Sequence, residues 1–152
     1  MKPIRKLIFH WSASKSTTTV KDIDNWHRGR GWRMIGYHRV ILHPDSDTKG
    51  NVSVWSQLVK QGRPLDMDPY LSDFETGAHT FGHNGDAVGI CVIGNKDYSL
   101  HPLQLTAIQQ TAAILVARFR LNWKDVHCHR DFNKTECPGN EIASVIQRLK
   151  DG

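Results

Sequence analysis

The segment from His127 to Gly139 constrains the fold of this chain more than any other part of its sequence. Within thirteen residues it contains two histidines, two cysteines and a Pro-Gly pair. Imidazole and thiolate are ligands that zinc prefers, and a catalytic zinc usually has three protein ligands and one open position. His127 and His129 are two residues apart, so on a strand they would face the same side. This segment can supply two ligands, so the fold has to bring a third from a distant part of the chain.

The third ligand is expected on a separate element, because zinc fingers need closely spaced ligand pairs such as C-x2-C, and none occurs here. His10 follows the apolar run 7–9, which is typical of a buried strand. A histidine at the end of a central strand can project into a cleft, or it can be a core residue bonded to the backbone. The candidate ligands are therefore His10, His129 and Cys137, with the second interpretation of His10 left open.

The composition is that of a soluble globular protein. The chain has 152 residues, enough for a single domain over residues 1–152, with 39% hydrophobic and 23% charged residues. No segment approaches the roughly 18 apolar residues of a membrane span, and the start shows no secretory signal. Three cysteines, an odd number, without a signal peptide argue against a disulfide framework.

The positive charge indicates an anionic partner but does not identify it. The net charge is +5 and the isoelectric point is near 9.3, which favours polyanions such as nucleic acid, anionic lipid or a bacterial envelope. The basic residues are spread along the chain, and no helix carries clustered arginines and lysines. Nucleic acid is therefore not expected as a partner.

The pattern of apolar residues predicts five strands and three helices. The strands are expected at 7–9, 36–42, 52–55, 87–93 and 125–129, and the helices after Thr19, from Pro102 to Phe119 and over 140–150. The region 43–76 otherwise reads as a long surface loop. The order β-α-β-β-β-α-β-α predicts a single α/β (α+β) domain with a central mixed sheet flanked by helices.

Four segments together resemble the zinc-dependent N-acetylmuramoyl-L-alanine amidases. That family includes the phage T7 lysozyme type and shares its fold with peptidoglycan recognition proteins. Each segment is weak alone, but the four occur in the family's order and cover nearly the whole chain. They are Ile8–Ser14, Trp26–His38 with its Gly-Tyr-His end, Gly77–Ile90 and His129–Gly139.

The resemblance implies one zinc ion and a specific ligand set. The ligands would be His10, the histidine eight residues before the Cys-Pro pair, which is His129, and Cys137 itself. His127 and Cys128 would then be packing residues. Binding-only recognition proteins of this fold typically lack the cysteine, so its presence favours an enzyme.

The resemblance also implies which residues act on the substrate. Tyr37 is carried over as a catalytic residue, and the family's second catalytic position, two before the cysteine, is Thr135, with Lys134 beside it as the alternative. His79 and Asn84 are expected to contact the glycan or peptide stem. His38 is placed with them among the substrate-binding residues, supporting the site from behind.

Cys91 departs from the pattern of some relatives, which have a glutamate in this strand. A cysteine cannot serve there as the acid/base carboxylate. That role is therefore expected to shift toward water, Tyr37 and the zinc itself.

The implied activity is hydrolysis of the amide bond between N-acetylmuramic acid and L-alanine in bacterial peptidoglycan. The expected setting is a phage or prophage endolysin, a monomer made in the host cytoplasm without a signal peptide and active on the cell wall after release. Two alternatives stay open, a cell-wall recycling amidase and a non-catalytic peptidoglycan-binding module of the same fold.

Overall fold

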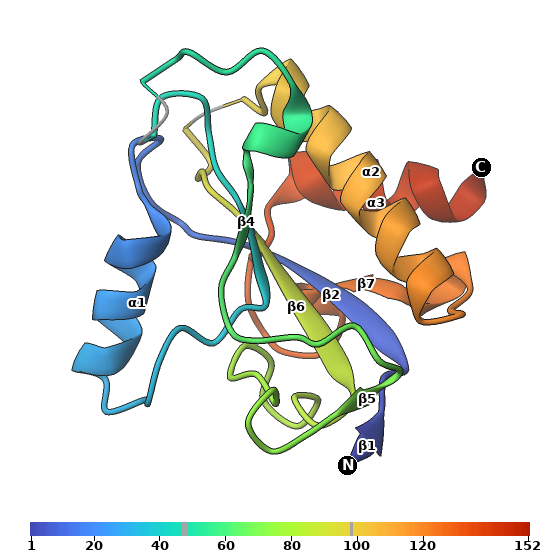
Figure 1. Ribbon diagram of the computed structural model, residues 1–152. Helices are drawn as coiled ribbons and strands as arrows, with labels where there is room; N and C mark the ends of the chain where they lie inside the picture. Colours follow the sequence, from blue (N-terminus) through green and yellow to red (C-terminus); the bar gives the residue numbers. More distant parts are fainter. Residues whose placement is uncertain (47–48, 98) are drawn as a thin grey trace.

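The computed structural model describes residues 1–46, 49–97 and 99–152 (Figure 1). Within these ranges, no helix is both long and apolar enough to cross a membrane. The elements, in chain order, are β1 (Lys2–Pro3), β2 (Lys6–Trp11), α1 (Val20–Gly29), β3 (Arg39–Ile41), the 3-10 turn η1 (Trp55–Gln57), β4 (Val59–Gln61), β5 (Tyr70–Leu71), β6 (Ala87–Val92), α2 (Pro102–Arg118), η2 (Trp123–Asp125), β7 (Val126–Cys128), η3 (His129–Asp131) and α3 (Asn140–Asp151).

The main sheet is mixed and has five strands in the order β4-β3-β6-β2-β7. β2 pairs in parallel with both β6 and β7, β3 pairs in parallel with β6, and only β4 is antiparallel to its neighbour. The two central strands, β2 and β6, are almost entirely buried, as expected for parallel strands covered on both faces. The predicted fold class and the order of the elements in this sheet are thus confirmed.

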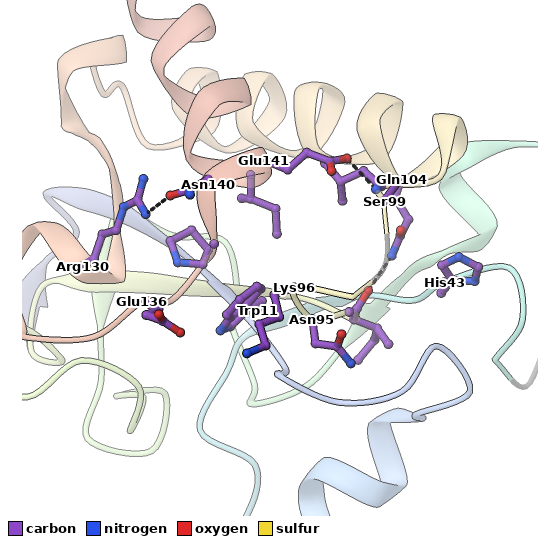
Figure 2. A pocket seen from close by; sticks show the side chains of 16 residues that line it. Trp11, His43, Asn95, Lys96, Ser99, Gln104, Arg130, Glu136, Asn140 and Glu141 are labelled. Carbon is purple, nitrogen blue, oxygen red and sulfur yellow. Dashed lines mark hydrogen bonds between the residues drawn. The ribbon is translucent and has the colours of Figure 1, made fainter.

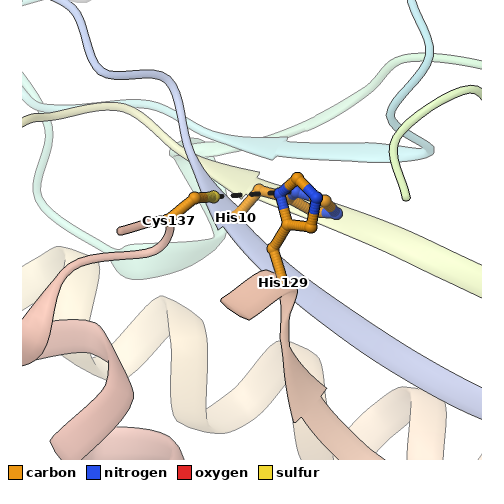
Figure 3. Close-up of side chains that lie close together, drawn as sticks. All are labelled: His10, His129 and Cys137. Carbon is orange, nitrogen blue, oxygen red and sulfur yellow. Dashed lines mark hydrogen bonds between the residues drawn. The ribbon is translucent and has the colours of Figure 1, made fainter. Parts of the chain in front are cut away.

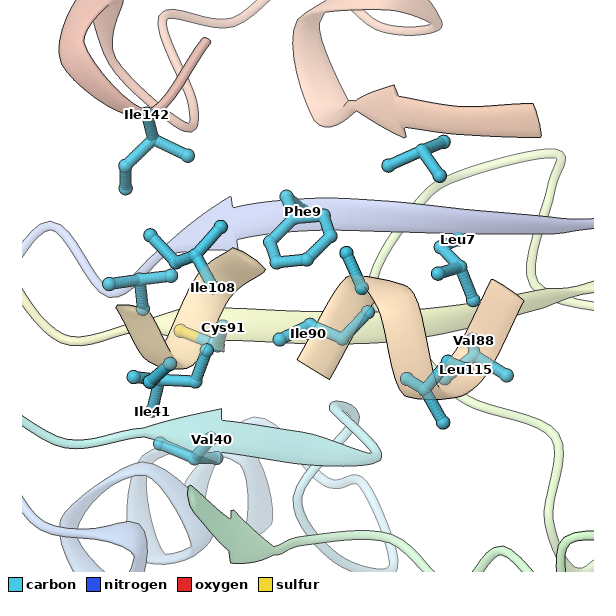
Figure 4. Close-up of a cluster of buried hydrophobic side chains, with 14 of the residues drawn as sticks. Leu7, Phe9, Val40, Ile41, Val88, Ile90, Cys91, Ile108, Leu115 and Ile142 are labelled. Carbon is cyan, nitrogen blue, oxygen red and sulfur yellow. The ribbon is translucent and has the colours of Figure 1, made fainter. Parts of the chain in front are cut away.

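Helices α2 and α3 lie on one side of this sheet and α1 lies on the other (Figure 1). Beneath α2 and α3, Phe9 and its registered neighbour Ile90 pack with Ile108 and Ile142, all at most 4% exposed (Figure 4). Side chains alternate along a strand, so His10 and its registered neighbour Cys91 face the opposite side. The apolar run that predicts β2 therefore also directs His10 away from the two long helices.

The helices begin and end close to where the sequence predicts. α1 starts after Thr19, whose hydroxyl accepts the Asp22 N–H while the Asp22 carboxylate accepts the Thr19 N–H, a reciprocal capping box. α2 has Pro102 in its first turn, and α3 buries Ile142, Val145 and Ile146 on one face.

The strand predicted at 36–42 is shorter than expected. β3 covers only residues 39–41, and Gly36, Tyr37 and His38 lie before it as irregular chain. Gly36 passes so close to Ala78 that a Cβ there would lie 2.0 Å from the Ala78 carbonyl oxygen. The backbone of Tyr37 and His38 still bonds the neighbouring chain, since the His38 N–H donates to the Gly89 carbonyl and the Tyr37 carbonyl accepts the Arg63 N–H.

The prediction for the region 43–76 is wrong in two respects. The strand lies at 59–61, not at 52–55, and the region is no simple surface loop, since Leu58, Leu65 and Leu71 belong to the core. β5 also pairs with β1 in a separate two-stranded sheet. The buried guanidinium of Arg63 donates to the carbonyls of Met34, Ile35 and Thr76, so it ties this region to the chain before β3.

Candidate metal centre and active site

His10, His129 and Cys137 come together at the carboxyl ends of β2 and β7 (Figure 3). His10 is near the end of β2 and is 1% exposed. His129 is the first residue of η3, directly after β7, and Cys137 lies in the loop that leads to α3. One potential ligand atom from each residue lies within 4.8 Å of the other two. The three side chains that the sequence analysis names as ligands are therefore neighbours.

The separation of Cys137 and His10 is close to that of two ligands in a tetrahedral zinc site. Bonds of about 2.1 Å to nitrogen and 2.3 Å to sulfur would place the ligand atoms roughly 3.3–3.6 Å apart. Cys137 Sγ lies 3.8 Å from His10 Nδ1. Two imidazoles and one thiolate are a typical donor set for a catalytic zinc that keeps one position open. His129 is only half-buried, so the cluster is open toward its side.

Burial keeps the two imidazoles neutral. It lowers the pKa of His10 well below its usual value, and the nearby His79 and His129 add to the effect. It also lowers the pKa of His129, against a hydrogen bond to Asn133. Neutral imidazole is the form that binds a metal.

Cys137 is a buried side chain that stays protonated as a thiol when no cation is bound. Burial raises its pKa to about 12, although the backbone N–H of Trp11, 3.3 Å from Sγ, acts in the opposite direction. Since a metal ligand must be the thiolate, zinc binding at this position releases a proton.

Tyr37 lies beside the cluster. Its ring centroid is 5.0 Å from that of His10, and Cys91 and Cys137 are among its neighbours. Burial raises the pKa of Tyr37 well above 10, and the neighbouring Cys91 and Cys137 raise it further. The phenol therefore keeps its proton at neutral pH and is a hydrogen-bond donor.

Thr135 is exposed on the loop that carries Cys137. Its Oγ1 accepts the Cys137 N–H at 3.2 Å, which leaves its own hydroxyl proton available to another acceptor. Lys134 beside it is also exposed. Both candidates for the second catalytic position therefore lie at the rim of the cluster.

Of the three expected substrate-binding residues, His38 and His79 are buried and Asn84 is half-buried. His38 is fully buried, with Nδ1 accepting the Gly89 N–H and Nε2 donating to the Glu75 carbonyl. His79 is turned inward against His10. Asn84 Oδ1 accepts two backbone N–H groups, those of His79 and Thr80. These contacts give each of the three a structural role, and their contact with a substrate stays a prediction.

Two residues that contact the candidate ligands are not predicted from the sequence. Asn133, four residues after His129, accepts the Nε2–H of His129 on its Oδ1 at 2.9 Å. The Trp11 backbone bonds Cys137 as described above. The i,i+4 spacing of His129 and Asn133 would have been a usable signal, whereas a backbone contact across the fold leaves none in the sequence. His127 and Cys128, expected as packing residues, are half-buried and buried respectively.

A cavity of about 410 Å³ lies next to this site and not in it (Figure 2). Trp11 forms one wall, and residues at the start of α3 and in the 94–100 loop form others. Glu136 and Pro138, on either side of Cys137, line it, but none of the three clustered side chains does. The cavity and the cluster thus share the Cys137 loop as a common wall.

Known proteins match the chain over most of its length. The family model described as N-acetylmuramoyl-L-alanine amidase matches residues 1–140. The endolysin of Klebsiella phage KP32 is 26% identical over 90% of this chain and 82% of its own length. The endolysin of Escherichia phage T7 is 22% identical over 90% of this chain and 81% of its own length.

Solved structures match the fold. The N-acetylmuramoyl-L-alanine amidase LysC from Clostridium intestinale has a TM-score of 0.74 and 26% identity, covering 97% of this chain and 86% of that one. Drosophila PGRP-LB has a TM-score of 0.72 and 25% identity, covering 97% and 81%. With the family model spanning all three clustered side chains, the chain belongs to the N-acetylmuramoyl-L-alanine amidase family.

Proposed function

We propose that this chain is a zinc hydrolase that cleaves the amide bond between the lactyl group of N-acetylmuramic acid and L-alanine in peptidoglycan. The observation that carries the zinc assignment is the cluster of His10, His129 and Cys137, with ligand atoms within 4.8 Å of one another. Membership of the amidase family supports the same activity. A zinc ion held there would act as a Lewis acid on the scissile carbonyl and activate water as the nucleophile.

Tyr37 and Thr135 would supply the hydrogen bonds that the reaction needs. The attacked carbonyl develops negative charge on its oxygen, and the neutral phenol of Tyr37, beside His10, would donate to it. The hydroxyl of Thr135, or the ammonium of Lys134 beside it, would donate from the rim of the cluster. Cys91 lies beside Tyr37 and cannot itself act as a carboxylate base.

We further propose that the biological role is that of an endolysin, which acts on the cell wall after release from the host cytoplasm. The similarity to phage endolysins over 90% of the chain supports this role. The net charge of +5 would favour approach to an anionic wall. A muropeptide is the expected binding partner, and a monomer is the expected state. A related fold, a PGRP-LB variant, has been solved in complex with tracheal cytotoxin.

Removal of the metal should abolish hydrolysis reversibly. We expect protein treated with a zinc chelator and then freed of it to be inactive on purified peptidoglycan, and one equivalent of Zn²⁺ to restore activity. Mg²⁺ should not restore it, because this cation prefers carboxylate and water oxygens and the cluster offers nitrogen and sulfur. Turbidity clearing measures the activity, and mass spectrometry measures the zinc. Full activity in protein without detectable zinc would contradict the proposal.

A further inference from the structure

The His79 side chain is built into the protein beside the metal cluster. It is 9% exposed, and its Nδ1 lies 3.0 Å from His10 Nε2. Its Nε2 lies 3.3 Å from the Ala87 carbonyl oxygen. Both ring nitrogens are thus engaged inside the protein, one of them with a candidate metal ligand.

These contacts determine which nitrogen of each ring carries the proton. A carbonyl oxygen only accepts hydrogen bonds, so Nε2 of His79 must donate to Ala87. In a neutral ring Nδ1 of His79 is then the acceptor, and Nε2 of His10 must donate to it. His10 Nδ1 is consequently left without a proton, on the side where Cys137 Sγ lies 3.8 Å away. The Ala87 carbonyl of β6 therefore fixes the tautomer of His79, and His79 in turn fixes the tautomer of His10.

The His79 ring is held in this position by two glycines. A Cβ on Gly89 or on Gly77 would lie 2.6 Å from atoms of the ring, a distance that real contacts do not show. Gly89 belongs to β6 and pairs with Ile8, two residues before His10. Because the ring rests on bare backbone of the sheet, its distance from His10 is set by the sheet itself.

The chain around the ring is fixed as well. Asn84 Oδ1 accepts the N–H groups of His79 and Thr80, at 2.8 and 2.9 Å. Thr80 Oγ1 lies 2.9 Å from His79 Nδ1 and 3.3 Å from His10 Nε2, so it closes the network. These hydrogen bonds fix the backbone of the 77–86 loop at the point where His79 contacts His10.

We propose that His79 is a positioning residue for the metal centre: it accepts the Nε2–H of His10 and so holds His10 with Nδ1 directed at the zinc. This inference rests on the proposed function, because it assumes a zinc ion at the cluster. Outer partners of metal-bound histidines usually are carboxylates, carbonyls or waters, and they contribute about 10- to 100-fold to metal affinity. Here a buried imidazole takes that place for His10, while the Asn133 amide takes it for His129.

The first test uses the unmodified, zinc-loaded protein. Proton–nitrogen correlation spectra of the histidine rings report which ring nitrogen is protonated. We expect His79 protonated at Nε2 only, and His10 protonated at Nε2 with Nδ1 bound to the metal. His79 protonated at Nδ1 would overturn the proposal, because it could then no longer accept from His10.

The second test measures zinc affinity by competition with a coloured chelator. His79→Phe keeps a flat ring on the glycines but has no acceptor, and we expect zinc to bind about 10- to 100-fold more weakly. His79→Gln restores an acceptor oxygen and should bind zinc more tightly than His79→Phe. The matched control is His27→Gln, which replaces another buried histidine. Its Nδ1 accepts the Gly36 N–H and its ring packs on Tyr37, not on a ligand, so the substitution should leave zinc affinity unchanged.

The outcomes separate this inference from the proposed function. If the unmodified chain binds no zinc, the proposed function fails. If it binds zinc and folded His79→Phe binds it equally well, only the role of His79 fails. If His79→Phe does not fold, the ring spectra of the unmodified protein still show whether His79 accepts the hydrogen bond from His10.

Discussion

Cys137→Ser is expected to abolish peptidoglycan hydrolysis, with a rate at least about 10³-fold below that of the unmodified chain. The loss should exceed that of a single oxyanion donor, because the cluster would lose its only thiolate and with it the zinc. His129→Ala should have the same effect, since it leaves a single imidazole beside the thiol. Zinc content by mass spectrometry and clearing of purified peptidoglycan measure the two consequences together.

The neighbouring cysteine and histidine provide matched controls. Cys128→Ser makes the same chemical change at another buried cysteine, on β7, that is outside the cluster. His127→Ala removes a half-buried histidine whose Nδ1 lies 3.9 Å from the Asp131 carboxylate. Both controls should keep bound zinc and hydrolysis. Hydrolysis that persists in Cys137→Ser, or that is lost equally in Cys128→Ser, would contradict the ligand assignment.

Tyr37→Phe is expected to retain zinc and to lower turnover by about 10²- to 10³-fold, the usual cost of one oxyanion donor. The phenol is protonated because burial and the adjacent Cys91 raise its pKa, so the hydroxyl can act only as a donor near neutral pH. Removing it leaves the ring in place, 5.0 Å from that of His10, and leaves the three ligands untouched.

Initial rates on a soluble muropeptide, with zinc content measured in parallel, test this expectation. Tyr70→Phe is the control. It removes the same hydroxyl from an exposed tyrosine on β5, which contributes no residue to the cluster. Turnover of Tyr37→Phe equal to that of Tyr70→Phe would remove Tyr37 from the reaction. A loss of zinc would instead give Tyr37 a structural role.

Strong local signals made most of the fold predictable. The run 7–9 is apolar without interruption, and the Thr19 and Asp22 side chains cap α1 without help from distant residues. The strand expected at 52–55 failed for an equally local reason. The N–H groups of Ser53 and Val54 donate to the Gln57 side chain, which turns the chain where alternation of residues predicts a strand.

The site was predictable only as a set of residue types and not as an arrangement. His10, His129 and Cys137 are metal-binding side chains with a recognisable order, and the fold brings them together. The substrate-binding role of His79 follows only from the family resemblance and stays a prediction. Its place against the sheet could not be predicted, because the contact between Gly89 of β6 and the His79 ring depends on tertiary structure.

The chemical group released from the cell wall tests the central claim most directly. We expect zinc-loaded protein to release new amino termini of L-alanine from purified peptidoglycan, and no new reducing sugar ends. Protein that only binds peptidoglycan through the same fold would release neither. New reducing ends, new amino termini of another residue, or no release at all would contradict the account.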